Sequence, residues 1–270
     1  MRDFTMFQAD AFADRLFAGN PAAVMVLDAA LPDDLMQALA AENNQSETAF
    51  VVSRGGGHAI RWFTPTHEAA FCGHATLAAA HILMTEYGHA GPLEFSTGKV
   101  GLLRVVSCGA GYELDLPRHD ATPVDVVPDA LMPVLPDGWV AILRNFENHF
   151  VILRDARAVR DYVPDFATMK RLGNGGIAIT GPGGMDHAGR PVDFSSRFFA
   201  PAHGIDEDPV TGSAHATLAP YWAGVLGRAE LSAFQASRRG GRIGCRVTGE
   251  RVYLTGQAIT YLKGAIRLPV

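Results

Sequence analysis

The chain has 270 residues, of which 48% are hydrophobic and 19% charged, and its net charge is −5 at pH 7. This composition is typical of a globular protein and argues against disorder. The modest negative charge argues against a nucleic-acid surface, which requires a basic patch. The length allows one large domain or two smaller ones, since domains usually have roughly 100–200 residues.

The N-terminal sequence MRDFTMFQADAF carries acidic residues where a signal peptide would need an apolar run. No window approaches the length of uninterrupted apolar sequence that spans a membrane. We therefore expect a cytoplasmic protein without membrane partners. Three scattered cysteines without CxxC spacing indicate neither a disulfide framework nor a zinc site. Glycine-rich phosphate-binding spacings are also missing, so we expect no metal and no cofactor.

The hydrophobic pattern predicts strands and helices in a similar order in both halves of the chain. In the first half we expect strands over 24–27, 49–52 and 60–63 and helices over 35–42 and 74–84. In the second half we expect strands over 151–153, 176–180 and 193–199 and a helix over 214–226. The helices at 74–84 and 214–226 carry alanine, leucine and other small residues on all sides. Such helices are buried all round, so we expect a sheet to wrap around each.

An internal repeat supports the same division. FTPTHEAAFCGHATLAAA, from Phe63, matches FAPAHGIDEDPVTGSAHATLAP, from Phe199, and both contain His-Ala-Thr-Leu-Ala. A repeat over about half the chain favours two similar halves rather than a solenoid. We place them at 1–118 and 119–270 and allow for the last strand to return to the first half.

In both copies a glycine and a polar residue stand where the helix is expected to begin, as Gly73-His74 and Gly212-Ser213. Helix starts present unpaired N–H groups and bind carboxylates or phosphates. Two such starts facing one cleft would clamp a small acid. The alternative for each copy alone is an ordinary N-cap at Ser213 and a surface residue at His74.

Four segments resemble the PhzF-like family, named for the phenazine-biosynthesis isomerase: FAGNPAAV, NQSETAFV and the two repeat segments. The resemblance implies a mixed α/β (α+β) fold like that of diaminopimelate epimerase. Its two pseudo-symmetric halves are each a curled mixed sheet around a central helix. It also implies a cofactor-independent isomerase of a small carboxylate-bearing metabolite and a homodimer. The phenazine enzyme isomerises a dihydro-hydroxyanthranilate, but nothing in the sequence assigns that substrate to this chain.

The resemblance makes Glu47 the acid/base that moves a proton, a role that requires a pKa raised toward neutrality by partial burial. Without it, Glu47 would be an exposed residue leading a strand. His74, Asp208 and Ser213 are assigned to the same site, and Asp208 would otherwise be a turn residue before Pro209. Asp206 and Glu207 are expected to be solvated loop charges. Substrate binding is expected from Asn20, Ser46, Gly73, Ala75, Gly212 and Ala214.

Cys72 creates a rival mechanism. Diaminopimelate epimerase and its racemase relatives use two cysteines, one before each helix start. This chain has Cys72 before Gly73 but Thr211 before Gly212, and a threonine hydroxyl is no thiolate-like base at neutral pH. Two alternatives stay open: an amino-acid or hydroxy-acid epimerase or racemase using Cys72 with Glu47, and a non-catalytic ligand-binding protein on the same scaffold.

Overall fold

The computed structural model describes residues 1–54, 57–173 and 175–268. Contacts divide the chain into two compact units. Unit 1 comprises Met1–Asp115 and Thr255–Val270, and unit 2 comprises Leu116–Leu254. The expected halves differ from these units mainly at the C-terminus, because the last strand pairs antiparallel with the first, from Arg2↔Leu268 to Ala11↔Ala258.

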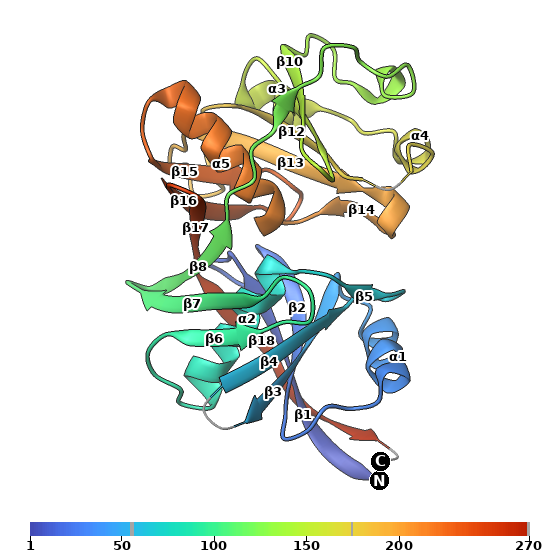
Figure 1. Ribbon diagram of the computed structural model, residues 1–270, viewed down its shortest axis with the longest axis vertical. Coiled ribbons are helices and arrows are strands. Elements are labelled where there is room, and N and C mark those ends of the chain that lie inside the picture. Colours follow the sequence, from blue (N-terminus) through green and yellow to red (C-terminus); the bar gives the residue numbers. More distant parts are fainter. Residues whose placement is uncertain (55–56, 174, 269–270) are drawn as a thin grey trace. The chain divides into compact units, whose positions relative to one another are not determined.

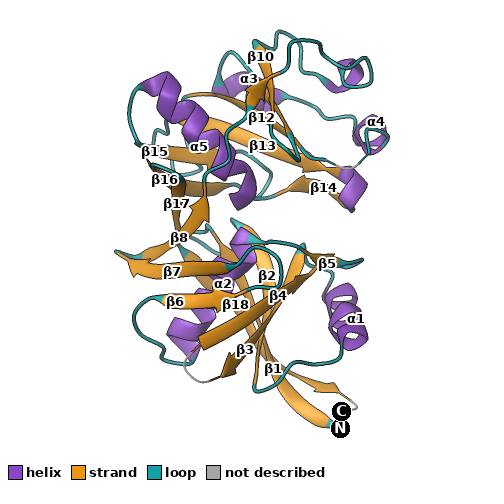
Figure 2. Cartoon of the chain, in the orientation of Figure 1, coloured by secondary structure: helices purple, strands orange, loops and turns teal. Residues whose placement is uncertain are grey.

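Unit 1 is a mixed sheet with two helices (Figures 1 and 2). Its elements are β1 (Arg2–Ala11), β2 (Asn20–Leu27), α1 (Asp33–Asn43), β3 (Glu47–Arg54), β4 (Gly57–Phe63), β5 (Glu68–Ala69), α2 (Gly73–Glu86), β6 (Leu93–Ser96), β7 (Leu102–Cys108), β8 (Gly111–Pro117) and β18 (Ala258–Leu268). The pairs β2/β3 and β4/β6 are parallel and are linked through α1 and α2, while β1/β2, β3/β4, β6/β7 and β7/β8 are antiparallel.

Helix α2 lies in the centre of unit 1 and contacts β1, β2, β3 and β18 (Figure 1). All of its residues from Gly73 to Leu83 are buried. His81 connects it to both ends of the sheet: Nδ1 lies 2.8 Å from the Tyr112 hydroxyl in β8 and Nε2 lies 3.0 Å from Thr260 Oγ1 in β18. The expectation of a helix buried all round is confirmed.

Helix α1 packs on β3 and β4. Asp33 and Asp34 in its first turn favour the helix N-terminus through the helix dipole. Asn44 ends it in the left-handed conformation, with φ 48°, which asparagine tolerates better than most residues. This tight ending leads within three residues to Glu47, the first residue of β3.

Unit 2 repeats the order of connections seen in unit 1. Its elements are β9 (Thr122–Pro123), η1 (Met132–Val134), β10 (Ala141–Arg144), β11 (His149–Ile152), α3 (Ala156–Asp161), α4 (Phe166–Lys170), β12 (Ile177–Pro182), β13 (Phe194–Ala200), η2 (Pro201–His203), β14 (Ile205–Asp208), α5 (Gly212–Leu226), β15 (Glu230–Gln235), β16 (Gly241–Thr248) and β17 (Arg251–Gly256). The pairs β11/β12 and β13/β15 are parallel, and β12/β13 and β15/β16 are antiparallel. An internal duplication is our interpretation of this match.

The buried helix of unit 2 is α5, which contacts β15 and β16. Side chains also connect it to two further strands: the Trp222 indole donates to Thr180 Oγ1 in β12, and His215 Nε2 lies 3.3 Å from Ser196 Oγ in β13. A separate apolar core, including Val151, Val159 and Phe199, lies under α3 and α4. Every predicted strand and helix is present, whereas several further strands, among them the long β1 and β18, were not anticipated.

Candidate functional site

Four polar residues meet at the start of α2 in unit 1. Glu47 opens β3, Asn20 opens β2, Cys72 is the N-cap of α2, and His74 is the second residue of that helix. The parallel pairing of β2 with β3, which sets Ala22 opposite Glu47, brings the beginnings of both strands together. Asn20, Cys72 and His74 are buried, and only 13% of the Glu47 side chain is exposed.

The residue before Asn20 must be glycine. Gly19 has φ 64°, and a Cβ atom at this position would overlap the carbonyl oxygen of Ala11. A positive φ is readily accessible only to glycine. The Gly-Asn pair of the FAGNPAAV motif thus turns the chain so that the Asn20 side chain enters the interior.

The imidazole of His74 lies between two partners. Nε2 is 3.3 Å from Glu47 Oε2, and Nδ1 is 3.1 Å from the Asn20 amide nitrogen. An amide nitrogen only donates, so in this orientation Nδ1 accepts and the ring proton is on Nε2. Ser46 donates to the Asn20 amide oxygen at 3.4 Å. Asn20 therefore holds the ring of His74 in place and sets its tautomer.

His74 is neutral at physiological pH. Burial lowers its pKa to about 3, although a hydrogen bond with the Pro21 backbone acts in the opposite direction. The contact with Glu47 is therefore not a salt bridge at pH 7. A neutral imidazole beside the carboxyl group does not hold that group in the charged form by charge attraction. Such a setting suits a carboxyl group that gains and loses a proton.

Cys72 belongs to the same cluster. Its sulfur lies 3.4 Å from His74 Nδ1 and 4.0 Å from Nε2. Glu47, Cys72 and His74 each offer one donor atom to a cation, and these atoms all lie within 4.8 Å of one another. Cys72 is thus in contact with the predicted chemistry and is more than a small residue filling the core.

A second polar cluster precedes α5 in unit 2. The Thr211 hydroxyl donates to Asp208 Oδ2 at 2.5 Å. Gln235, which is fully buried in β15, accepts from the Thr211 backbone N–H at 2.8 Å and donates to the Asp208 carbonyl at 2.7 Å. Sequence reasoning missed Gln235, because a single glutamine at the end of an apolar strand gives no signal.

The structure contradicts the expectation for Glu207 and the ordinary structural alternatives for Asp208, Ser213 and His74. Asp208 is the buried last residue of β14 and not a turn residue. Glu207 is not a solvated loop charge, because Arg197 donates to both of its carboxylate oxygens at 2.6 and 3.0 Å. Ser213 is not the N-cap of α5, since that position belongs to Thr211. Nor is His74 a surface residue.

The starts of α2 and α5 resemble each other in detail. Each begins with a buried glycine, followed by His74 or Ser213 and then by buried Ala75 or Ala214. Neither N-cap side chain hydrogen-bonds to its helix, whereas Asp155 and Asp165 cap α3 and α4 in that way. Backbone N–H groups in the first turns of α2 and α5 therefore suit an anionic ligand.

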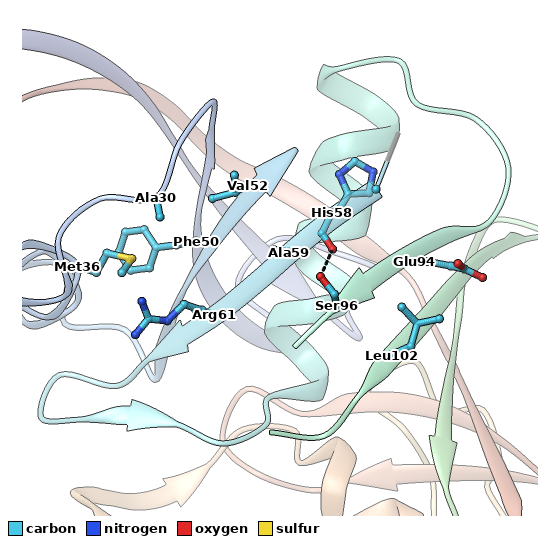
Figure 3. Close-up of a pocket in the computed structure, with 11 residues that line it drawn as sticks. Ala30, Met36, Phe50, Val52, His58, Ala59, Arg61, Glu94, Ser96 and Leu102 are labelled. Atoms are coloured by element: carbon cyan, nitrogen blue, oxygen red, sulfur yellow. Dashed lines mark hydrogen bonds between the residues drawn. The ribbon is translucent and has the colours of Figure 1, made fainter. Parts of the chain in front are cut away.

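A surface hollow also lies on unit 1, over β3, β4 and β6 beside α1 (Figure 3). Apolar side chains such as Phe50, Val52 and Leu102 line it, with Arg61 and Glu94 among them. Ser96 donates to the His58 carbonyl within it at 3.2 Å. Its lining contains none of the residues predicted for the site.

Among the described residues, the structure contains no helix with the length and apolar character that a membrane span requires.

Comparison with known proteins identifies the family of this chain. A family model described as phenazine biosynthesis-like protein matches residues 9–264. The chain is 45% identical to an uncharacterised isomerase of Pseudomonas aeruginosa, over 98% of this chain and 100% of that protein. It is 40% identical to the crystal structure of a PhzF family protein from Enterococcus faecalis, which it covers completely, with 99% of this chain aligned and a TM-score of 0.90.

A more distant structure, a predicted epimerase from Pseudomonas aeruginosa, is 24% identical, with a TM-score of 0.71 over 97% of this chain and 99% of that one. At this identity the likeness concerns the fold alone, and it agrees with the expected mixed α/β architecture of the epimerase type. The matches over nearly the whole chain lead to one conclusion: this protein belongs to the phenazine biosynthesis-like (PhzF) family.

Proposed function

We propose that this protein is a cofactor-independent isomerase that moves a proton on a small carboxylate-bearing metabolite, with Glu47 as the acid/base. The observation that carries the proposal is the partly exposed carboxyl group of Glu47 beside the buried, neutral imidazole of His74. The name of the related Pseudomonas aeruginosa protein, an isomerase, supports the reaction class.

In this proposal Glu47 takes a proton from one carbon of the substrate and returns it to another. The buried imidazole of His74, whose Nε2 lies 3.3 Å from Glu47 Oε2, packs against the carboxylate and keeps it aimed at the substrate. Asn20 and Ser46 are positioning residues, because Asn20 contacts His74 and Ser46 contacts Asn20. A direct contact of Asn20 or Ser46 with substrate stays a prediction. Because the same residue removes the proton and returns it, the reaction needs no cofactor to accept or supply that proton.

The substrate carboxylate would bind at the backbone N–H groups of a helix start. Each favourable helix end contributes roughly 0.3–1 kcal/mol when exposed and about 2 kcal/mol when partly buried. That one anion contacts both α2 and α5, with help from Ser213 and Asp208, stays a prediction. It is tested with Gly73→Val and Gly212→Val: if a single acid uses both starts, each variant weakens binding of that same acid.

One observation favours a second candidate, an amino-acid or hydroxy-acid epimerase. The Cys72 sulfur lies 3.4 Å from His74 Nδ1, so a thiol and a carboxyl group approach the two nitrogens of one ring. In that reaction Cys72 and Glu47 would act as two bases on one α-carbon. The isomerase proposal instead uses Glu47 alone.

Incubation with a panel of small acids in D₂O, followed by NMR, separates the candidates. The isomerase gives a product with a shifted double bond or proton and deuterium at the new position. An epimerase gives exchange at the α-carbon, and a binding protein gives neither. Cys72→Ala should keep most isomerase activity, and iodoacetamide should not inactivate the enzyme. Rapid inactivation that substrate prevents would favour the epimerase.

A further inference from the structure

We propose that Gln235 and Thr211 are positioning residues that act through Asp208. Together they form a hydrogen-bond chain that runs in one direction, from the Gln235 amide to the Thr211 hydroxyl and on to Oδ2 of Asp208. In such a chain Oδ2 only accepts, so a proton or a substrate group that Asp208 binds meets its other oxygen, Oδ1. The role in turnover rests on the proposed function, in which Asp208 belongs to the site, whereas the direction of the chain does not.

Backbone groups fix which end of the Gln235 amide faces which partner. The Thr211 backbone N–H can only donate, so the atom 2.8 Å from it is the amide oxygen, Oε1. The Asp208 backbone carbonyl can only accept, so the atom 2.7 Å from it is the amide nitrogen, Nε2. Both contacts agree on one orientation, because a half-turn of the amide would set donor against donor and acceptor against acceptor.

The orientation of the amide decides the direction of the next hydrogen bond. Nε2 lies 3.0 Å from Thr211 Oγ1 and only donates, so the hydroxyl oxygen accepts at this contact. The hydroxyl has a single proton, and Asp208 Oδ2, at 2.5 Å, accepts it. Oδ2 is therefore the unprotonated oxygen of Asp208.

The chain lies in a buried part of unit 2. Gln235 is fully buried at the end of β15, and Asp208 and Thr211 are also buried. The turn between Asp208 and Thr211 is held at a further point, because the Ser237 hydroxyl donates to the Pro209 carbonyl at 2.8 Å. Buried hydrogen-bonded networks of this kind hold their members in one arrangement. Asp208 is thus fixed both at its backbone carbonyl and at Oδ2.

Neutron diffraction from a crystal grown in D₂O tests the direction of the chain, because it locates deuterium atoms. We expect two deuterium atoms on Gln235 Nε2 and the Thr211 hydroxyl deuterium directed at Asp208 Oδ2. An amide in the opposite orientation, or a deuterium atom bound to Oδ2, overturns the chain. This measurement does not depend on which substrate the enzyme uses.

Kinetics with the acid that the D₂O panel identifies as substrate test the role in turnover. Thr211→Val keeps the shape of the side chain and removes the donor to Asp208, so kcat/KM should fall by up to about 10²-fold, the scale of a misplaced group in a site. Thr211→Ser keeps the hydroxyl and should retain most of the activity. Thr180→Val is the matched control, because the buried Thr180 hydroxyl also accepts from a side chain, the Trp222 indole, and donates to the Ser195 carbonyl. It should lower stability toward urea, as Thr211→Val does, but keep kcat/KM.

A second variant reverses the chain while keeping its outline. The carboxylate introduced by Gln235→Glu only accepts, so it competes with Asp208 for the Thr211 proton. We expect kcat/KM to fall as in Thr211→Val. The double variant should fall no further than the more impaired single variant, because both changes interrupt the same contact. Losses that multiply in the double variant would contradict the chain.

Circular dichroism verifies that each variant is folded, and Thr211→Ala replaces Thr211→Val if the latter does not fold. Unchanged kcat/KM in the folded variant, or an equal loss in Thr180→Val, overturns the positioning role. Near-normal turnover in Glu47→Gln contradicts the proposed function instead. If no acid in the panel reacts, the function and the role in turnover fall together, while the neutron result still decides the direction of the chain.

Discussion

The starts of α2 and α5 share a backbone but differ in their chemistry. Both helices begin at a buried glycine after an N-cap residue in an extended conformation. The second position is His74 in α2, beside Glu47 and Cys72, and Ser213 in α5. Before α5, hydrogen bonds instead join Asp208, Thr211 and Gln235 to one another. One scaffold thus carries the proposed proton-transfer groups in unit 1 and a hydrogen-bonded frame in unit 2.

The two helix starts also show how the copies of the repeated pentapeptide align in the structure. Counted from the helix starts, His74 matches Ser213, and the fourth residues are Thr76 and His215. These two play the same part: Thr76 Oγ1 donates to the Cys72 carbonyl at 2.6 Å, and His215 Nδ1 lies 2.8 Å from the Thr211 carbonyl. The two histidines of the His-Ala-Thr-Leu-Ala repeat are therefore not structural equivalents, because the identity is out of step with the helix starts.

The largest effect is expected when the proposed acid/base beside the start of α2 is removed, because this residue is the main chemical difference from the start of α5. Glu47→Gln keeps the shape of the side chain and removes the transferable proton, so turnover should fall roughly 10²- to 10⁴-fold while ligand binding is nearly unchanged. Deuterium incorporation measured by NMR reports turnover, and calorimetry reports binding. Near-normal turnover in this variant would remove Glu47 from the mechanism and with it the contrast between the two helix starts.

A smaller effect is expected at Asn20, which orients His74. Asn20→Ala should lower kcat by up to about 10²-fold, the scale of a displaced catalytic group, with little change in KM. If Asn20 instead binds substrate, KM rises and kcat stays. Ser46 contacts Asn20 and not His74, so Ser46→Ala is the matched test. It should lower kcat by less than Asn20→Ala does.

The smallest effect concerns stability and compares the two buried imidazoles. Burial lowers the pKa of His74 to about 3 and of His215 to about 4, while an unfolded histidine titrates near 6.5. Below pH 6.5 the unfolded chain therefore binds protons that the folded protein does not. The free energy of unfolding should fall by about 1.4 kcal/mol per pH unit for each such histidine as the pH drops toward 4.

Urea unfolding at pH 7, 6 and 5 measures this slope. His215→Gln and His74→Gln should each reduce it, whereas His67→Gln, at an exposed position, should leave it unchanged. An unchanged slope in both buried variants would mean that the two imidazoles do not govern the acid sensitivity. A reduced slope in only one of them would show that the two helix starts differ in electrostatics as well as in chemistry.

The central elements could be predicted from the sequence because periodicity is a local property. The runs after Gly73 and Gly212, rich in alanine, leucine and small residues on all sides, predicted both buried helices, and short apolar runs predicted the strands beside them. Motif resemblance predicted Glu47, His74, Asp208 and Ser213 as site residues, and that assignment stays a prediction. The long strand β18 was missed, because most of its side chains are exposed or only partly buried and give a weak pattern.

Contacts between distant segments were decided only by the tertiary structure. Spacing along the chain did not place Glu47 beside Cys72 and His74, which the strand beginning at Glu47 and the helix beginning at Gly73 bring together. Likewise, the sequence did not indicate that Asn20 contacts His74. Nor did it indicate that Gln235 contacts Asp208 and Thr211. The hydrophobic pattern along a chain specifies which side of an element is buried, whereas the polar groups that meet there depend on how strands and helices pack, which no local pattern records.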